Sequence, residues 1–505
     1  MVKQMDHASL DEIADAITAE LDAIAAENNI AIEYEVYSGQ GDQSVLMQIG
    51  DQAVADGVDA IIPVATLAAQ VMAVCAEDSQ TPVIFAAISD PEAAELTGID
   101  YVTGTSDALD TESVMEMMLA QNPDLQNVGL LYSLSEPNSA MPIEEAKAYL
   151  EAHYFVTPSR AALALETGAT AAKAARRLER RDIDVYVGIP FCPTRCAYCS
   201  FVSQSVERSF ALVPPYVDAL CAEITAGGGM VRRAGLRVRT FYMGGGTPTT
   251  LTAEQMDRVL TAFETAFDRA ACEELTVEAG RPDTITAEKL AVLKSHGVTR
   301  VSVNPQTFEE PVLRAIGRRH TAADIDAAMD LVARCGFPHV NMDLIAGLPE
   351  DTAEGFRRSL DRCLSYGPDD ITVHTLALKK GSRILTQGLR IPGAETVAAM
   401  LDYAGPALRD AGYRPYYLYR QKYMSGSFEN IGWCRGGGEC WYNVDIMSEL
   451  CSILSFGAAG STKMVVPGTN QIQRAFNVKY PTEYIQRPEK WQANQAAFAA
   501  FYEAL

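Results

Sequence analysis

The residues best suited to chemistry are three cysteines within eight positions of one another, Cys192, Cys196 and Cys199. Their C-x3-C-x2-C spacing brings three thiolates into one short loop, and thiolates are the ligands that iron–sulfur clusters prefer. A zinc site is the alternative, but structural zinc usually takes four ligands, and no fourth cysteine stands at such a spacing. Reduced core cysteines are a second alternative, although a proline-rich loop makes a poor core. The spacing predicts an iron–sulfur cluster.

Three cysteines would hold a [4Fe–4S] cluster incompletely. A cubane cluster has one iron more than three cysteines can ligate. That iron would lack a protein ligand and could chelate the amino and carboxylate groups of S-adenosylmethionine. Electron transfer from the cluster to the sulfonium would then break a C–S bond and release a 5′-deoxyadenosyl radical. We therefore predict both cofactors.

A glycine run follows one strand later, at Gly244, Gly245 and Gly246, and continues into Thr247. Glycines remove the side chains that would keep the backbone away from a small ligand. Such a run is by itself more typical of a tight turn. Following the cysteine loop, it predicts a cradle for the methionine moiety.

Polar side chains at the ends of three later predicted strands, Glu278, Gln306 and Asp343, favour a shell that positions one ligand. Each of them alone could be an ordinary polar residue at a barrel rim. The six histidines are scattered, and most are expected to be surface or packing residues.

The elements that must position these residues alternate between strand and helix. Helical stretches at 252–269 and 286–296 separate apolar runs, which predicts a partial parallel (β/α)6 barrel with its active site at the carboxyl ends of the strands. Residues 395–505 are expected to form an α/β cap. The predicted strands are 184–191, 239–246, 274–280, 300–307, 339–347 and 370–377.

Charge divides the chain. Residues 1–150 hold 27 acidic and 2 basic residues, which accounts for the whole net charge of −25. A change of composition this sharp predicts a domain boundary near residue 152. The predicted domains are residues 1–150, a helical linker at 151–182, the barrel at 183–394 and the C-terminal domain at 395–505.

The first third also alternates between helix and strand. A helix is predicted at 8–28, and βαβ alternation predicts a Rossmann-like lobe with a parallel sheet. The predicted strands are 32–37, 60–64, 83–87 and 128–132.

Residues of about 154–490 resemble the oxygen-independent coproporphyrinogen III dehydrogenases of the HemZ type. The match rests on Tyr186 through Cys192, the Gly-Gly-Gly-Thr-Pro-Thr run and the segment from Asn341 to Pro349. More type-specific runs are 419–424, 428–432, 442–443 and 475–479. The resemblance implies oxidative decarboxylation of two propionates of coproporphyrinogen III, giving protoporphyrinogen IX. It also implies a reduced flavodoxin or ferredoxin-type electron donor.

The same resemblance implies contacts to one or two molecules of S-adenosylmethionine. Tyr186, Gly245 and Glu278 would contact the first. The second would meet Tyr198, Gly246, Thr247, Gln306, Arg318, Asp343 and Ala377. This sequence departs from many relatives at Gly188, Tyr198 and Ser200. Close tyrosines from Tyr413 to Tyr423 could cover a macrocycle or fill a core, and Arg420 and Lys422 could pair with substrate carboxylates.

Residues 5–150 resemble part of an ABC-transporter substrate-binding protein for aromatic amino acids and related solutes. The match rests on 41–44, 65–70, 87–91, 129–132 and 135–139. Family members have two lobes that close on the ligand, whereas this chain would have one lobe and the start of a second. An export signal and the opening strand are expected to be missing.

Bulk composition excludes several other classes. No apolar run approaches the ~20 residues of a membrane span, and the acidic first third opposes nucleic-acid binding. An odd set of 11 cysteines disfavours a secreted disulfide framework, so the cytosol is expected. Three alternatives stay open: a haem chaperone of the same superfamily, solute binding by residues 5–150, and a chimeric chain joined near residue 152.

Overall fold

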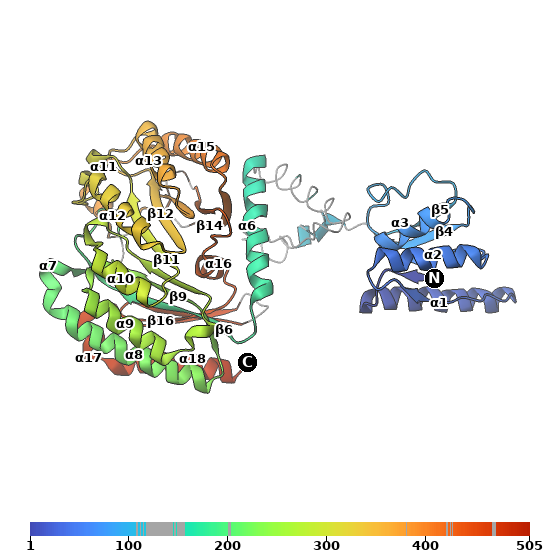
Figure 1. Ribbon diagram of the computed structural model, residues 1–505, viewed down its shortest axis with the longest axis horizontal. Helices are drawn as coiled ribbons and strands as arrows, with labels where there is room; N and C mark the ends of the chain where they lie inside the picture. Colours follow the sequence, from blue (N-terminus) through green and yellow to red (C-terminus); the bar gives the residue numbers. More distant parts are fainter. Residues whose placement is uncertain are drawn as a thin grey trace. The chain divides into compact units, whose positions relative to one another are not determined.

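In a computed structural model the chain divides into two compact units, Met1–Ala162 and Leu163–Leu505 (Figure 1). The structure describes residues 1–107, 157–199, 204–379, 381–420, 428–466 and 471–505, with a few residues at 110–117, 145, 148 and 423–426. The predicted strand at 128–132 and the loop at 135–139 lie outside the described residues.

The first unit is a parallel sheet connected by helices, as the sequence predicts. Its described strands run in the order β2-β1-β3-β4-β5, and every pair is parallel. The strands are β1 (Val2–Lys3), β2 (Tyr37–Ser38), β3 (Pro63–Val64), β4 (Val83–Ile88) and β5 (Val102–Ser106). The helices are α1 (Ala8–Asn28), α2 (Gln43–Ala55) and α3 (Thr66–Cys75).

Several details of this unit differ from the sequence-based prediction: β5 was not predicted, and the strand predicted at 60–64 shortens to β3. The opening strand is present: β1 pairs with both β2 and β3, and Val2 is only 1% exposed in the apolar cluster of the unit. Two residues are too few to produce a periodic signal. The strand predicted at 32–37 shortens to β2, because Tyr34 and Val36 are exposed and have no core to face.

The second unit contains the predicted run of parallel strands. Their order is β6-β9-β10-β11-β12-β13, with parallel pairing throughout. This confirms the α/β barrel-type fold. The strands are β6 (Asp182–Ile189), β9 (Arg237–Gly245), β10 (Glu274–Glu278), β11 (Arg300–Gln306), β12 (His339–Ala346) and β13 (Asp370–Thr375).

Residues beyond 395 continue this sheet at both edges, where the sequence predicted a cap. β15 (Asn430–Cys434) lies antiparallel between β13 and β14 (Arg414–Tyr419). At the other edge β16 (Ser452–Phe456) is parallel to β6 and is followed by two antiparallel strands. Those two are β17 (Ser461–Val465) and β18 (Ile472–Phe476). These strands form one open 11-stranded sheet, and β7 (Phe191–Cys192) and β8 (Gln204–Ser205) pair separately in a two-stranded sheet.

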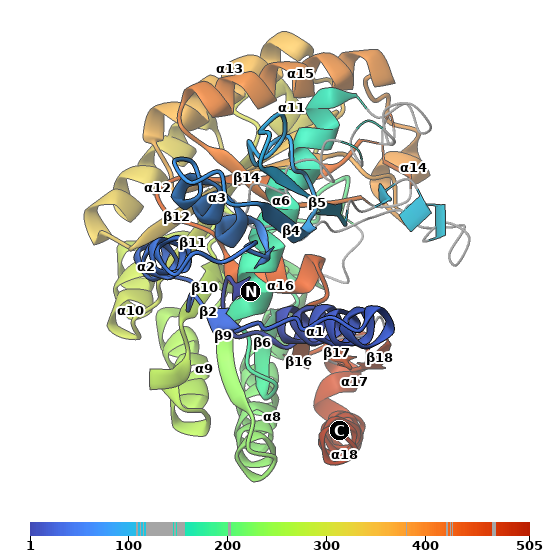
Figure 2. The same cartoon turned by 90° about the vertical axis from the view of Figure 1, so that its right-hand side faces the viewer.

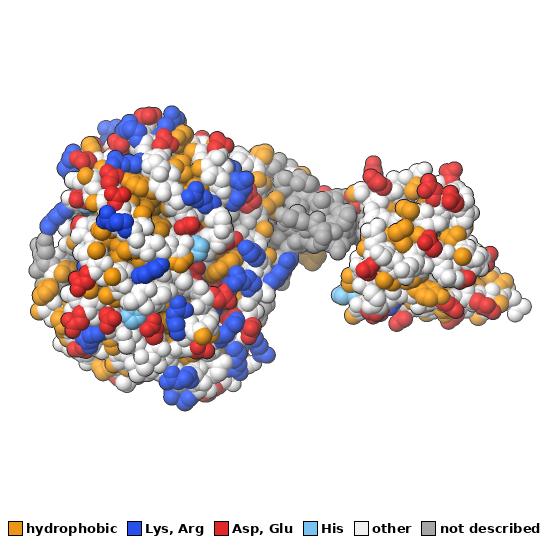
Figure 3. Space-filling model, viewed as in Figure 1, with side chains coloured by type: hydrophobic (Ala, Val, Ile, Leu, Met, Phe, Trp, Pro, Cys, Tyr) orange, Lys and Arg blue, Asp and Glu red, His pale blue; other side chains and the backbone are white. Residues whose placement is uncertain are grey.

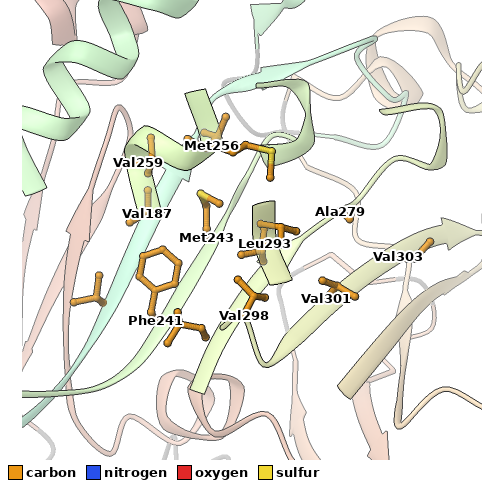
Figure 4. Close-up of a cluster of buried hydrophobic side chains, with 14 of the residues drawn as sticks. Val187, Phe241, Met243, Met256, Val259, Ala279, Leu293, Val298, Val301 and Val303 are labelled. Carbon is orange, nitrogen blue, oxygen red and sulfur yellow. The ribbon is translucent and has the colours of Figure 1, made fainter. Parts of the chain in front are cut away.

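Helices cover the outer side of this curved sheet (Figures 1 and 2). The core packs Val187 and Phe241 of neighbouring strands with Met256 and Val259 of α9 (Figure 4). Threonines cap the helix starts, as Thr252 does by accepting from the Gln255 N–H. The helices are α6 (Pro158–Arg177), α7 (Val206–Ser209), α8 (Val213–Arg233), α9 (Ala253–Ala266), α10 (Ala287–Ser295), α11 (Glu310–Ala315), α12 (Ala322–Cys335), α13 (Ala353–Tyr366), α14 (Arg383–Gln387), α15 (Ala394–Asp410), α16 (Trp441–Met447), α17 (Pro481–Gln486) and α18 (Pro488–Glu503).

The surfaces of the two units differ in charge. Acidic groups dominate the visible face of the first unit, whereas both signs mix over the second (Figure 3). Of the helices in the described part of the chain, none combines the length and the apolar character needed to span a membrane.

Candidate active site

A cavity of about 350 Å³ lies within the curve of the barrel sheet. Ala377 is the one residue of the predicted set that does not line it; it follows β13, where its backbone pairs with Met424. The twelve predicted residues that line the cavity are Tyr186, Cys192, Cys196, Tyr198, Cys199, Gly245, Gly246, Thr247, Glu278, Gln306, Arg318 and Asp343.

The cysteine loop is held by backbone hydrogen bonds to segments far away in the sequence. The Ala197 N–H donates to the Ile316 carbonyl (2.9 Å), and the Ile384 N–H donates to the Ala197 carbonyl (3.1 Å). The Thr194 hydroxyl donates to the Gly317 carbonyl (2.9 Å). These bonds fix the loop from which the three thiols project.

Two guanidinium groups favour the thiolate form of Cys196. Burial would raise the pKa of this thiol, but the positive charges of Arg318 and Arg281 outweigh burial and lower it. Arg318 also donates to the Tyr198 hydroxyl (3.1 Å). Because a thiolate is the form that binds metal, this environment suits a ligand cysteine.

The three thiols are not gathered as they would be around a single zinc ion. Zinc holds each sulfur at about 2.3 Å, which puts two sulfurs on one ion about 3.8 Å apart. Cys192, Cys196 and Cys199 do not form a group whose sulfurs all lie within 4.8 Å of one another. The three thiols therefore do not form a closed zinc site.

The glycine run allows two backbones to approach closely beside the cysteine loop. A Cβ atom on Gly246 would lie 2.6 Å from the Phe191 carbonyl oxygen and 3.0 Å from the Cys192 sulfur. Gly245 adopts a φ of 105°, which side chains disfavour. The Gly246 N–H donates to the Ile189 carbonyl (2.7 Å). The run therefore leaves backbone exposed to a ligand in the cavity.

Two buried groups of the lining lack a partner in the structure. They are the side-chain carbonyl of Gln306 and the Nε of Arg318. Gln306 also has a φ of 71°, a strained conformation that functional sites often hold. An acceptor and a donor left open in one cavity fit a small polar, zwitterionic ligand such as S-adenosylmethionine.

Glu278 is a buried carboxyl among aromatic rings. Burial raises its pKa to about 7, the hydrogen bond from Tyr242 opposes this rise, and the Asp343 charge adds to it. The Tyr242 hydroxyl donates to Glu278 at 2.8 Å. The Tyr242 ring stacks on Tyr186 and Tyr442, with centroids 6.1 and 4.6 Å apart. The carboxylate is thus held in one orientation, ready for a cationic or hydrogen-bonding ligand.

A further part of the lining, which we call the β12–β14 wall, comes from β12, β13, β14 and α16. Asn341 donates to the Asp343 carboxylate (2.8 Å), and the His374 Nε2 lies 3.7 Å from its other oxygen. Tyr417 and Tyr419 stack with centroids 6.3 Å apart. The wall consists of Asn341, Asp343, Thr372, His374, Tyr417, Tyr419, Asn443 and Met447.

Sequence reasoning assigned no role to several lining residues, above all Arg281 and His374. Both follow or lie in strands that already carried predicted residues, so their strand-end position was the available signal. The other unassigned residues are Thr194, Tyr242, Gly280, Asn304, Thr372 and Met447.

The tyrosine cluster divides between cavity and core. Tyr417 and Tyr419 line the cavity, whereas Tyr413 and Tyr416 are buried elsewhere and Tyr423 is 70% exposed. Arg420 does not line the cavity, and Lys422 lies outside the described residues. The structure therefore does not bring Arg420 to the site.

Comparisons with known proteins agree with these two units. Residues 1–175 match the family of ABC transporter substrate binding proteins, and residues 186–363 match the radical SAM superfamily. The heme chaperone HemW of Mycobacterium tuberculosis is 29% identical over 60% of this chain and 73% of its own length. The solved coproporphyrinogen III oxidase HemN of Escherichia coli, a radical SAM enzyme, superimposes with a TM-score of 0.50. It is 25% identical and covers 63% of this chain and 71% of its own.

A curated relative from Bacillus subtilis is more similar in sequence. The oxygen-independent coproporphyrinogen-III oxidase-like protein HemZ is 38% identical, over 70% of this chain and 72% of its own length. Identity at this level over most of the relative confirms the resemblance expected from the motifs. The chain belongs to the HemZ-type family of oxygen-independent coproporphyrinogen-III oxidase-like proteins within the radical SAM superfamily.

Proposed function

We propose that the second unit catalyses oxygen-independent oxidative decarboxylation of coproporphyrinogen III to protoporphyrinogen IX. The observation that carries the proposal is one cavity lined by the three cysteines, the glycine run and the polar strand-end residues, in a chain of the HemZ-type family. The names of the HemZ and HemN relatives supply the substrate. A reduced flavodoxin or ferredoxin-type protein is the proposed electron donor.

The chain's own residues would hold the cofactors and position them. Cys192, Cys196 and Cys199 would bind the cluster. Tyr186, Gly245 and Glu278 would contact one S-adenosylmethionine. A second molecule would meet the residues named for it above, from Tyr198 to Ala377. When bound, the two cofactors supply a carbon-centred radical able to take a hydrogen atom from the β-carbon of a propionate.

The protein supplies orientation and a protected site, as enzymes with reactive cofactors do. Hydrogen-atom abstraction needs no base, which agrees with a lining that has one histidine. The stacked Tyr186, Tyr242 and Tyr442 rings keep water from one side of the cavity. Glu278, held by Tyr242, fixes the position of a ligand against that side.

Anaerobic turnover of coproporphyrinogen III by the cluster-loaded full chain tests this function. We expect carbon dioxide and 5′-deoxyadenosine to form together with protoporphyrinogen IX. Tight haem binding without carbon dioxide release would instead support the chaperone function suggested by the HemW relatives. That outcome would overturn the proposal.

Solute binding by the first unit is a second candidate function. It is favoured by the match of residues 1–175 to the ABC transporter substrate binding proteins. Calorimetry of the full chain with tryptophan, tyrosine and phenylalanine tests it. Saturable heat would support an aromatic amino acid site, and its absence with all three would contradict one.

A further inference from the structure

The described lining of the cavity has three side chains able to carry a positive charge, Arg281, Arg318 and His374. Arg281 is already engaged, because it donates to both oxygens of Asp283 at 3.0 and 3.1 Å. Arg318 donates to the Tyr198 hydroxyl at 3.1 Å and lies beside the cysteine loop. Both guanidinium groups therefore interact on the side of the cavity that carries the cysteines.

His374 is differently placed. Its Nε2 lies 3.7 Å from the Asp343 carboxylate, beyond hydrogen-bond distance, and its side chain is 26% exposed. No described residue forms a hydrogen bond with the ring. The imidazole is therefore available to hydrogen-bond a ligand that enters the cavity.

The position of His374 fits a substrate contact. It lies on β13, whose pairing with β12 sets Thr372 opposite Asp343 and His374 opposite Ile345. Neighbouring strands run about 4.8 Å apart, so His374 lies next to the strand that carries Asp343, a proposed cofactor contact. The reacting β-carbon of a propionate is two bonds from its carboxylate carbon. A carboxylate bound at β13 would thus leave that carbon facing the cofactor side.

The rest of the β12–β14 wall suits a tetrapyrrole ring. Tyr417 and Tyr419 offer parallel stacked rings, and Met447 of α16 adds an adaptable apolar surface. Apart from His374, no described residue of this wall can carry a positive charge. A substrate with an apolar ring and anionic arms would find, in this wall, one donor able to carry a positive charge.

We propose that His374 donates a hydrogen bond to the carboxylate of the propionate that reacts, and so positions that arm within the cavity. This assignment rests on the proposed function. It makes His374 a substrate-binding residue specific for a carboxylate arm.

Equilibrium binding gives the first test. The probe is coproporphyrin III, the oxidised ring that retains four propionates, titrated into the cluster-loaded full chain and followed by fluorescence. A hydrogen bond to a charged group is worth about 1.5–3 kcal/mol, so His374→Phe should weaken binding roughly 10- to 100-fold. His374→Gln, which keeps an N–H donor, should recover part of the loss. His339→Gln, at the amino end of β12 and outside the cavity, is the matched control and should bind like the unsubstituted protein.

Anaerobic kinetics give the second test. In His374→Phe the KM for coproporphyrinogen III should rise by a similar factor, and more 5′-deoxyadenosine should form per carbon dioxide because the arm is held loosely. An unchanged KM and an unchanged ratio in a variant that still carries its cluster would overturn the role of His374 while leaving the function intact. Absence of carbon dioxide with the unsubstituted protein would overturn the proposed function, and this assignment with it.

Discussion

At the scale of single residues, the site depends on the lack of a side chain at Gly246 and on a buried carboxyl group at Glu278. Gly246 lies where its missing Cβ lets the glycine run meet the cysteine loop, within 3.0 Å of the Cys192 sulfur. Glu278 depends on the opposite condition, a carboxyl group kept in an apolar and aromatic setting. Both conditions are costly for folding, which is typical of functional positions.

Substitution of Gly246 by alanine should disrupt the cluster loop, because the new methyl group would overlap the Phe191 and Ile189 carbonyls at 2.6 and 2.8 Å. We expect cluster content or S-adenosylmethionine cleavage to fall at least roughly tenfold. A tenfold loss corresponds to a destabilisation of about 1.4 kcal/mol. Gly229→Ala is the control. Its Cβ would meet only the end of Arg233, at 3.4 Å, and a helix interior should gain about 0.5–1 kcal/mol of stability from alanine.

Glu278→Gln should change stability with pH in a defined direction. Burial raises the folded-state pKa of Glu278 to about 7, so the carboxyl group favours the fold at low pH and loses that contribution as pH rises through 7. Glutamine cannot ionise and keeps an acceptor for Tyr242. In the cofactor-free protein, the free energy of unfolding of Glu278→Gln relative to that of the unsubstituted chain should therefore rise by about 1–3 kcal/mol when the pH is raised from 5 to 8. Urea unfolding at both pH values measures this.

Glu503→Gln, at an exposed carboxylate, is the matched control. An equal gain at pH 5 and pH 8 for Glu278→Gln would show that Glu278 does not titrate as inferred. Reductive cleavage of S-adenosylmethionine should fall in the same Glu278 variant.

At the scale of elements, one buried network joins α8, β16 and α17. Glu223 accepts from the Asn477 amide (2.7 Å), the Gly457 N–H (2.7 Å) and the Tyr484 hydroxyl. Tyr216 of the same helix donates to the Gly188 carbonyl (2.7 Å), just before the cysteine loop. Residues distant in sequence thereby fix the end of β6.

Glu223→Gln should destabilise the second unit by about 1–3 kcal/mol. The new amide NH₂ would point at one of the three donors that bind Glu223 and leave that donor without an acceptor. Urea unfolding followed by circular dichroism checks this expectation. Glu489→Gln, at an exposed carboxylate, provides the control and should stay within about 0.5 kcal/mol. Equal midpoints for the two variants would contradict the network.

Strands with apolar runs were predictable from the sequence, and so was the cavity wall that they carry. The six barrel strands agree with the predicted spans within a few residues. Cys192 and its two partners were identified by spacing, and Glu278, Gln306 and Asp343 by their place at strand ends. β1 escaped notice because two residues have no period, and His374 because its strand-end position was the only signal for it. The continuation of the sheet into β14–β18 depends on long-range pairing that no local pattern encodes.

At the scale of the whole molecule, the two units have separate cores. The apolar clusters of the first unit draw on residues up to Val102, and the main cluster of the second begins at Leu163. Net charge differs in the same way, since the first 150 residues carry all of it. Separate cores are the physical basis for separate folding.

Scanning calorimetry of the full chain should therefore show two unfolding transitions. Binding of the cluster stabilises only the unit that holds the three cysteines, so removal of iron should lower one transition and leave the other in place. A single transition that moves as a whole would contradict independent units.

The central claim is that three cysteines hold a cluster with one iron open to S-adenosylmethionine. Its most direct test is electron paramagnetic resonance of the anaerobically reduced full chain, with and without S-adenosylmethionine, alongside iron and sulfide analysis. We predict about four irons and four sulfides per chain, a signal that S-adenosylmethionine alters, and loss of both in Cys196→Ala. Stoichiometric zinc in place of iron, or a cluster signal that S-adenosylmethionine leaves unchanged, would contradict the claim.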